Sequence, residues 1–410
     1  MRSFFVFALL SFTHLTNAQI TPEISSWILN TTGATGYNNI PSNVQKVQYS
    51  DSNVYVSASC IPGYDIGPWQ GNPNIPKNQN FVFKITRFPK ANNNTPISTG
   101  LGHIGVWTNG VSIFNPKDGM SYNNQNVWNQ NAIVVEGPSF DNCLGHPAPN
   151  GEYHHHLNPR CLYNDTLSTL HAPIIGYAFD GFPVYGAFGY SNKDGTGGIR
   201  RMQSSYQIRN IIKRNILPNG MAASSAGPDV STRFPLGYYV EDYEFVQGSG
   251  DLDEHNGRFC VTPEYPKGIY AYFVSLDSNL IAAYPYVLGT SYYGLVPTGN
   301  TGPGSGHNTI RENVTSYNGT TQIDETVFEL KVILFENPAN SVLSILVNDN
   351  APNNLKLALL NVNGQIIHHW QYLQASSHYV FDVSGFETGM YYLKIYNESF
   401  QQTKPLQIIH

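Results

Sequence analysis

The chain has 410 residues and a formal net charge of −6. Only 12% of its residues are Asp, Glu, Lys or Arg, whereas 13% are aromatic and 41% are hydrophobic. The low charge content excludes a coiled coil or a long helical array, and the hydrophobic content excludes a disordered chain. An acidic chain without a basic block is not expected to bind nucleic acid. Asn, Gly, Tyr and Thr between short apolar runs favour turns and strands, so we expect a mostly β protein.

Residues 1–18 have the features of a secretory signal peptide. Arg2 precedes a short apolar run, and the small residue Ala18 suits a cleavage site. The segment is too short to span a membrane, and no later stretch approaches the roughly 18 uninterrupted apolar residues that a span requires. We therefore expect a mature protein that lies outside the cytoplasm and has no transmembrane segment.

Strand patterns continue through residues 19–290. Apolar and β-branched runs alternate with turn residues, and Asn109-Gly110 between two apolar runs predicts a two-residue hairpin. Helical periodicity is sparse, and one candidate helix covers residues 205–216. We expect this part of the chain to be rich in strands and poor in helices.

The chain has four cysteines, and an exported protein can form disulfides. Four cysteines allow three pairings. We favour Cys143–Cys161, which closes a short loop, and Cys60–Cys260, which ties the N-terminal region to a distant strand. The alternative for Cys60 and Cys260 is that both are simply small buried residues.

The most unusual segment runs from Asp141 to Cys161, DNCLGHPAPNGEYHHHLNPRC, and it holds four of the thirteen histidines. Imidazole is the commonest metal ligand among side chains near neutral pH. A strand directs alternate side chains to one face, so His154 and His156 point the same way while His155 points the other way. The spacing therefore offers two imidazole nitrogens to one ion.

A third ligand lies on the other side of a predicted turn. The sequence PAPNG lets the chain fold back between His146 and Tyr153, which brings His146 toward the pair. A Cys143–Cys161 disulfide would hold the base of this hairpin. Three imidazoles with an open coordination position suit Zn(II) or Cu(II). The alternative is that the histidines are structural or solvated and hold no metal.

Two further side chains are candidates for the same site. His171 lies ten residues after Cys161 and is a candidate fourth ligand or general acid/base. Asp180 is a candidate ligand, or a hydrogen-bond acceptor that orients a histidine. The alternative for Asp180 is an Asx turn, in which the carboxylate caps its own backbone.

The histidine segment also resembles the YHYH domain family. The matching residues are Cys143-Leu-Gly-His146-Pro, Gly151, Tyr153-His154-His155-His156, Pro159 and Cys161, followed by motifs that begin at His171, Leu252 and Val261. The resemblance covers residues 95–290 and leaves residues 19–94 as an N-terminal β-rich extension. The family tetrapeptide has Tyr where this chain has His155. That position is off the face of His154 and His156, so the departure does not affect the expected ligand pair.

The last eighty residues have a separate β pattern. Short strands alternate with turns in residues 327–410, and Asn363-Gly364 predicts a hairpin, which is typical of a small β-sandwich. Gly, Ser, Thr and Asn dominate residues 291–326, which we interpret as a linker.

The C-terminal module is similar to the sorting domain of the type IX secretion system of Bacteroidetes-type bacteria. The matching residues are Asn337-Pro338, Leu343, Ile345, Asn363-Gly364, Asp382-Val-Ser384, Gly389-Met-Tyr391 and Lys404. The resemblance implies passage through the periplasm, the type IX machinery as a partner, and a secreted or cell-surface location.

Two functions are compatible with these patterns. The first is an exported domain that binds Zn or Cu through its histidines. The second is a non-catalytic module that binds a glycan or a surface protein through aromatic faces such as Trp69, Trp107 and Trp128. The sequence contains no GxSxG elbow, Walker loop, HExxH helix or CxxC pair, which leaves open whether the protein is an enzyme.

Overall fold

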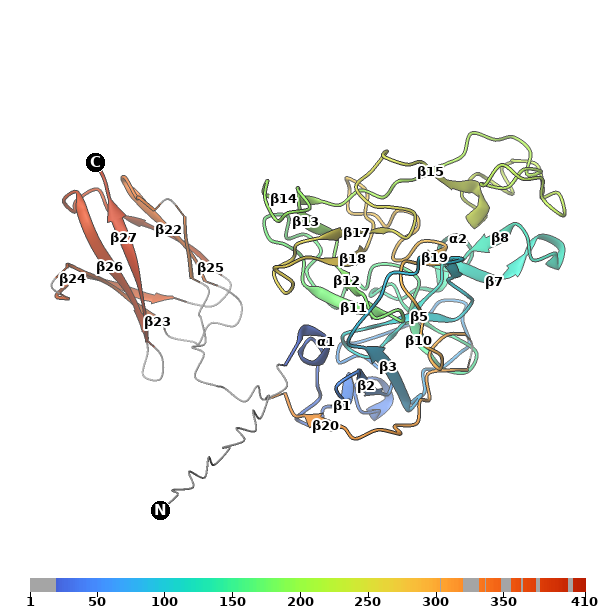
Figure 1. Cartoon of the computed structure of the whole chain (residues 1–410), viewed down its shortest axis with the longest axis horizontal. Helices are drawn as coiled ribbons and strands as arrows, with labels where there is room; N and C mark the ends of the chain where they lie inside the picture. The colour runs from blue at the N-terminus through green and yellow to red at the C-terminus, as the bar shows by residue number, and fades with distance from the viewer. Residues whose placement is uncertain are drawn as a thin grey trace, which may run out of the picture. The chain divides into compact units, whose positions relative to one another are not determined.

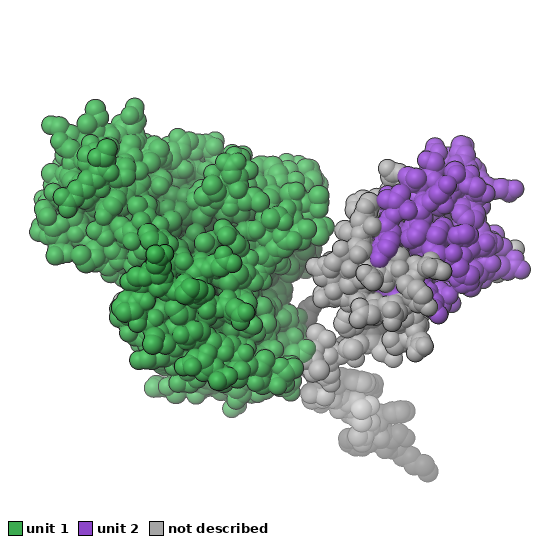
Figure 2. Space-filling view, turned by 180° about the vertical axis from the view of Figure 1, so that it is seen from behind, with its two compact units in different colours: residues 1–321 green, residues 322–410 purple. Residues whose placement is uncertain are grey.

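The computed structural model describes residues 20–302, 304–319, 332–335, 337–347, 355–362, 364–373, 377–396 and 401–410. The expected signal peptide, residues 1–18, lies outside this range. The chain forms two compact units, residues 1–321 and residues 322–410 (Figure 2). Strands dominate both, as the composition predicts. In the described range the α-helices are α1 (Pro22–Ser25) and α2 (Ala132–Val135).

An eight-stranded sheet runs through the first unit (Figure 1). Its strands, in spatial order, are β17 (Gly257–Cys260), β18 (Ile269–Phe273), β12 (Pro183–Tyr185), β11 (Ile174–Ala178), β5 (His103–Trp107), β6 (Ser112–Phe114), β10 (Tyr153–His155) and β9 (His146–Pro147). Most of its side chains are buried on both faces, and Trp107, Tyr177 and Tyr272 are fully buried. The histidine segment therefore forms one edge of a sheet that is anchored in a large aromatic core.

The predicted hairpin at Asn109-Gly110 is confirmed, because β5 and β6 pair antiparallel around it. Gly110 has a φ of +80°. A Cβ atom there would lie 2.5 Å from the Cβ of Ala58. The turn therefore requires glycine for its backbone conformation and also for close packing on a neighbouring strand.

A second sheet packs into the same core and contains part of the N-terminal extension. Its strands are β20 (Thr315–Tyr317), β1 (Val44–Tyr49), β2 (Asn53–Ala58) and β3 (Phe81–Thr86). Four two-stranded sheets complete the unit: β13 (Phe188–Tyr190) with β14 (Ile199–Arg201), β15 (Tyr206–Ile208) with β16 (Tyr243–Phe245), β19 (Ser291–Tyr292) with β4 (Ile97–Ser98), and β7 (Lys117–Ser121) with β8 (Asn129–Asn131).

The helix expected over residues 205–216 is wrong. Residues 206–208 form β15, and the remainder of the segment is irregular. Ile212 is 76% exposed, whereas Arg209 and Arg214 are buried. The guanidinium of Arg214 donates to Asp242 and to three backbone carbonyls. Burial of the arginines instead of the isoleucines overrides the apolar periodicity.

The interpretation of residues 291–326 as a linker needs correction over residues 291–319. This stretch contributes β19 and β20 to the first unit. Asn300 is fully buried. Its side-chain amide accepts from Lys84 N (3.0 Å) and donates to Lys84 O (2.5 Å) on β3. The polar side chains of this stretch suggest a solvated linker. In the structure, that of Asn300 is a hydrogen-bond partner for β3 instead.

The second unit has the predicted sandwich of two sheets. One contains β21 (Val332–Phe335), β22 (Val342–Val347) and β25 (Ser377–Asp382); the other contains β24 (Ile366–Leu373), β23 (Leu355–Leu360), β26 (Gly389–Tyr396) and β27 (Gln401–Ile408). Leu343 and Ile345 from the first sheet share one core with Leu357 and Leu393 from the second. β23 and β24 pair antiparallel on either side of the predicted Asn363-Gly364 turn, of which Asn363 lies outside the described residues.

Candidate metal centre

Strand β10 separates its side chains as alternation requires. Tyr153 and His155 lie on one face, where their ring centres are 5.3 Å apart. His154 and His156 share the opposite face, where their Nε2 atoms are 3.0 Å apart. β9 pairs antiparallel with β10, and His146 lies directly opposite His154 in the register. The predicted turn thus places the third imidazole beside the other two.

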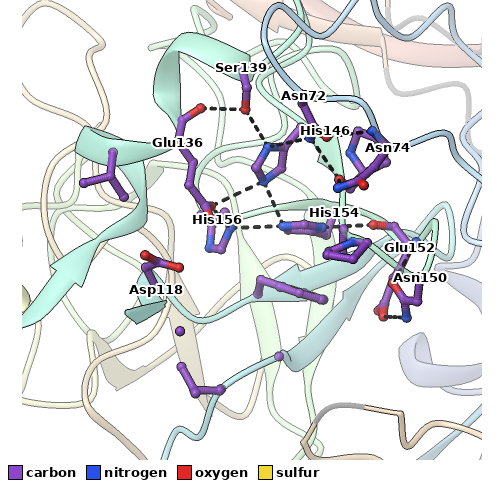
Figure 3. Close-up of a pocket in the computed structure, with 18 of the residues that line it drawn as sticks. Asn72, Asn74, Asp118, Glu136, Ser139, His146, Asn150, Glu152, His154 and His156 are labelled. Atoms are coloured by element: carbon purple, nitrogen blue, oxygen red, sulfur yellow. Dashed lines mark hydrogen bonds and ion pairs between the residues drawn. The ribbon is translucent and has the colours of Figure 1, made fainter. Parts of the chain in front are cut away.

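A carboxylate completes the cluster of potential ligands. His146 Nε2 lies 3.1 Å from His154 Nε2 and 3.4 Å from Glu136 Oε2. The same carboxylate oxygen is 3.0 Å from His156 Nε2. The four ligand atoms all lie within 4.8 Å of one another. Figure 3 shows the three rings and the carboxylate facing a common point.

Glu136 follows the short helix α2, whose first turn is capped by Asn131 through a hydrogen bond from Ile133 N. The Glu136 backbone N–H closes this helical turn on Ala132 O. Sequence reasoning missed Glu136, because it lies ten residues before His146 in the unremarkable stretch AIVVEGPSF. Only the three-dimensional contacts of its carboxylate with His146 and His156 identify it.

The outer nitrogen of each imidazole is bound to an oxygen. His154 Nδ1 donates to Glu152 O (3.0 Å), and His156 Nδ1 donates to Asn115 O (2.6 Å). His146 Nδ1 lies 2.8 Å from Ser139 Oγ. The Ser139 hydroxyl itself donates to the backbone carbonyl of Glu136 (2.7 Å), so it accepts from His146. Figure 3 shows these contacts around His146 and His154.

These partners determine the tautomer of the rings. Because each Nδ1 donates its proton, each neutral imidazole presents the lone pair of Nε2 to the centre of the cluster. Lone pairs that face each other at 3.0–3.1 Å repel unless a proton or a cation lies between them. Glu136 Oε2 is also buried there without a hydrogen-bond donor from the described residues. The cluster is therefore arranged for a positive charge at its centre.

Burial disfavours the protonated form of two of these imidazoles. It lowers the pKa of His154 well below the ordinary histidine value, and the neighbouring His156 and His146 lower it further. Burial also lowers the pKa of His146, and the nearby carboxylate of Glu136 offsets this only in part. A metal ligand must be unprotonated, so both shifts favour coordination.

The cluster opens into a large pocket with a volume of about 1070 Å³. Apolar side chains such as Leu101, Phe114 and Val135 line it together with polar ones such as Asn72 and Lys117. The Phe114 ring stacks on His154 with 3.8 Å between ring centres. An ion held here would be accessible to a ligand of moderate size from one side.

Comparisons with known families bear on this geometry. Residues 82–285 match the family model described as YHYH protein, and residues 334–409 match the secretion system C-terminal sorting domain. The chain is a YHYH-domain protein with a C-terminal sorting domain. A search of curated proteins found none that matches it.

The sorting domain indicates that this YHYH-domain protein is exported by the type IX secretion system, to the cell surface or the medium. Among the residues that the structure describes, no helix is long and apolar enough to cross a membrane. The YHYH match includes Glu136 and all three histidines of the cluster.

A disulfide closes the β9–β10 hairpin of the YHYH-domain protein. Cys143 and Cys161 form the predicted disulfide, with 5.2 Å between their Cα atoms. Asp141 reinforces the same loop, because its Oδ1 accepts from Cys143 N (2.9 Å) and Gly145 N (3.1 Å). Its Oδ2 accepts from the Tyr153 hydroxyl (2.9 Å). This network fixes the chain immediately before His146.

The predicted Cys60–Cys260 disulfide is wrong, because both cysteines are free and buried. Cys60 Sγ lies 3.1 Å from Tyr153 O on β10, whereas Cys260 ends β17. Five strands lie between β10 and β17 in the sheet, and neighbouring strands are spaced about 4.8 Å. A disulfide requires Cα atoms within about 7 Å. The alternative, that both are small buried residues, is confirmed.

The other candidate ligands do not join the cluster. His171 Nδ1 donates to Ala172 O (2.7 Å), and its ring packs on Tyr185. Asp180 accepts from Phe182 N (3.2 Å), Gly294 N (2.9 Å) and the Tyr272 hydroxyl (2.6 Å). The contact with Phe182 N is the Asx turn considered as the alternative. Asp180 thus joins its turn to β18 and to the segment after β19.

Proposed function

We propose that this exported YHYH-domain protein binds one divalent transition metal ion, zinc or copper, through His146, His154 and His156 with Glu136 as the fourth ligand. The convergence of three Nε2 lone pairs carries the proposal. The partners of each Nδ1 support it, because metal-bound histidines ordinarily donate the other ring N–H to an oxygen.

The spacing of the donor atoms fits such an ion. Ligands at about 2.0–2.1 Å from zinc at the corners of a tetrahedron lie about 3.3 Å apart. Four of the six separations, 3.0, 3.1, 3.4 and 3.0 Å, fall around that value, and all six are within 4.8 Å. Three imidazoles and a carboxylate suit Zn(II) and Cu(II) better than Cu(I), which prefers sulfur ligands.

Elemental analysis of natively secreted protein tests the proposal. We expect one zinc or copper ion per chain, and loss of that ion when His154 and His156 are both changed to Ala. The matched control is His307→Ala, which removes an exposed imidazole outside the cluster. Metal-free protein that also fails to take up either ion after chelation and dialysis would contradict the proposal.

The alternative glycan-binding role through tryptophan faces has no support in the structure. Trp107 and Trp128 are both fully buried, so neither can offer a ring face to a ligand. Trp69 is only partly buried, but it donates its indole N–H to Asp141 and packs on Tyr153. Trp69 instead contacts the loop that precedes His146, and Trp107 and Trp128 pack in the protein interior.

A further inference from the structure

We propose that Ser305, His103 and Glu152 form a second reactive centre on the same pocket, in which Ser305 is a nucleophile that accepts acyl groups from esters. Ser305 Oγ lies 2.8 Å from His103 Nε2, and His103 Nδ1 lies 2.9 Å from Glu152 Oε1. A hydroxyl, an imidazole and a carboxylate in this order can activate the hydroxyl and orient the base.

Burial increases from the nucleophile to the carboxylate. Ser305 is half-buried, whereas the side chains of His103 and Glu152 are 0% and 3% exposed. Only the serine is therefore accessible to a substrate. Glu152 and Gly304, the residue before Ser305, both line the pocket that holds the histidine cluster.

The imidazole of His103 is held in one orientation. Its ring makes edge-to-face contacts with four phenyl rings, those of Phe81, Phe83, Phe114 and Phe179. Ser112 Oγ donates to the same Glu152 oxygen (2.5 Å), which fixes the carboxylate in turn. A general base needs such fixed geometry to act on a hydroxyl proton.

A purely structural anchor for the loop around Ser305 would not need an ionisable pair. Removing an imidazole and a carboxylate from water costs several kcal/mol per ion if both are charged, whereas a neutral amide could hold a loop hydroxyl without that cost. Asn300 and Asn308 already attach this loop to β3 through side-chain amides. The buried His103–Glu152 pair therefore indicates chemistry at the serine.

The acyl transfer balances within these groups. Ser305 Oγ attacks the ester carbonyl carbon while its proton passes to His103 Nε2. The C–O bond to the alcohol breaks, and the departing oxygen takes the proton from Nε2. The product is an acyl-serine and a free alcohol, and water hydrolyses the acyl-serine by the same proton route.

Two features make this chemistry slow. The Ser305 hydroxyl donates to Gly302 O (2.6 Å), so it has to turn away from that carbonyl before its proton can pass to His103 Nε2. The backbone N–H groups of Ser305 and Gly306 already donate to Gly302 O and Gly299 O. A missing oxyanion donor lowers the rate about 10²–10³-fold. We therefore expect covalent labelling to be a better measure than turnover.

The test is labelling of the full-length secreted protein with a fluorophosphonate, followed by intact-mass and peptide mass spectrometry. We expect one adduct, located on Ser305, both with and without prior chelation of metal. Ser305→Ala should abolish it, and Glu152→Gln should slow labelling about 10²-fold. Because Glu152 is buried against His103 and Ser112, labelling of this variant is compared at a temperature at which thermal denaturation shows it to be folded. Ser98→Ala, an exposed serine of a different pocket, is the control and should label normally.

An adduct on another residue, equal labelling of Ser305→Ala, or no adduct at all would overturn the proposal. Because labelling is measured on chelated protein as well, its failure would leave the metal proposal untouched. Conversely, a protein that binds no metal but is labelled at Ser305 would support the serine centre and contradict the metal proposal.

Discussion

At the scale of residues, the outer nitrogen of each imidazole determines what the inner nitrogen can do. Two backbone carbonyls and one hydroxyl accept from the three Nδ1 atoms. Each ring therefore presents a lone pair at Nε2, which a metal ion can accept and a neighbouring lone pair cannot. A cation bound between these nitrogens would remove the repulsion between their lone pairs.

Glu136 should contribute to affinity as a charged ligand. We expect Glu136→Gln to weaken zinc binding at least about tenfold, because a neutral amide replaces an anionic oxygen. The matched control is Asp118→Asn, since Asp118 lines the same pocket but lies outside the ligand cluster. Competition with a zinc chelator measures both. Equal affinities for the two variants would show that Glu136 is not a ligand.

The pH at which metal is released follows from the shifted histidines. Protons compete with metal for Nε2, and burial lowers the pKa of both His146 and His154. Each of these rings is therefore half-protonated only at a pH below the ordinary histidine pKa of about 6.5. We expect full metal content from pH 8 to 6.5 and loss at lower pH, as measured by dialysis at stepped pH. Half-release at or above pH 6.5 would contradict this.

Sequence reasoning found three of the four clustered residues because strand alternation and a turn are local rules. It could not find Glu136, since the contact of its carboxylate with His146 and His156 is set by the tertiary fold. It also included Asp180 and His171, whose partners lie in the core. Local spacing predicts which side chains share a face, but not which distant groups reach that face.

At the scale of elements, the β9–β10 hairpin carries the site. The antiparallel register places His146 opposite His154, and the Cys143–Cys161 disulfide with Asp141 fixes the approach to His146. The same sequence logic failed for residues 205–216 and 291–319. In both segments, polar side chains bind backbone groups of other elements, and periodicity does not report such contacts.

Loss of the disulfide should affect stability and metal affinity together. The bond joins residues separated by 18 positions. Closing a loop of that length stabilises the folded state by about 3 kcal/mol. We expect the double change Cys143→Ser and Cys161→Ser to lower unfolding stability by about that amount and to weaken metal binding, measured by denaturant titration and chelator competition. The control is Cys260→Ser, which removes a free cysteine. Unchanged metal affinity in the double variant would show that the clamp does not position His146.

At the scale of the molecule, the two compact units have separate roles. The first contains the pocket and both proposed centres, and the second is the sorting domain. The fold class could be predicted from the sequence because turns and strand alternation recur along it. Both family matches agree with the resemblances seen in the sequence.

Removal of residues 322–410 should separate export from binding. We expect the truncated protein to remain inside the cell envelope while the first unit keeps its metal, because the whole cluster lies within that unit. Cell fractionation followed by elemental analysis of the purified protein measures both. Truncated protein that reaches the medium at the normal level would contradict the role of the sorting domain.

X-ray absorption at the metal edge of natively secreted protein tests the central claim most directly. We predict a single zinc or copper ion with three imidazole nitrogens and one carboxylate oxygen at about 2.0–2.1 Å. The imidazole scattering should disappear in the variant with His154 and His156 changed to Ala. A spectrum without imidazole ligands, or a metal signal unchanged in that variant, would contradict the claim.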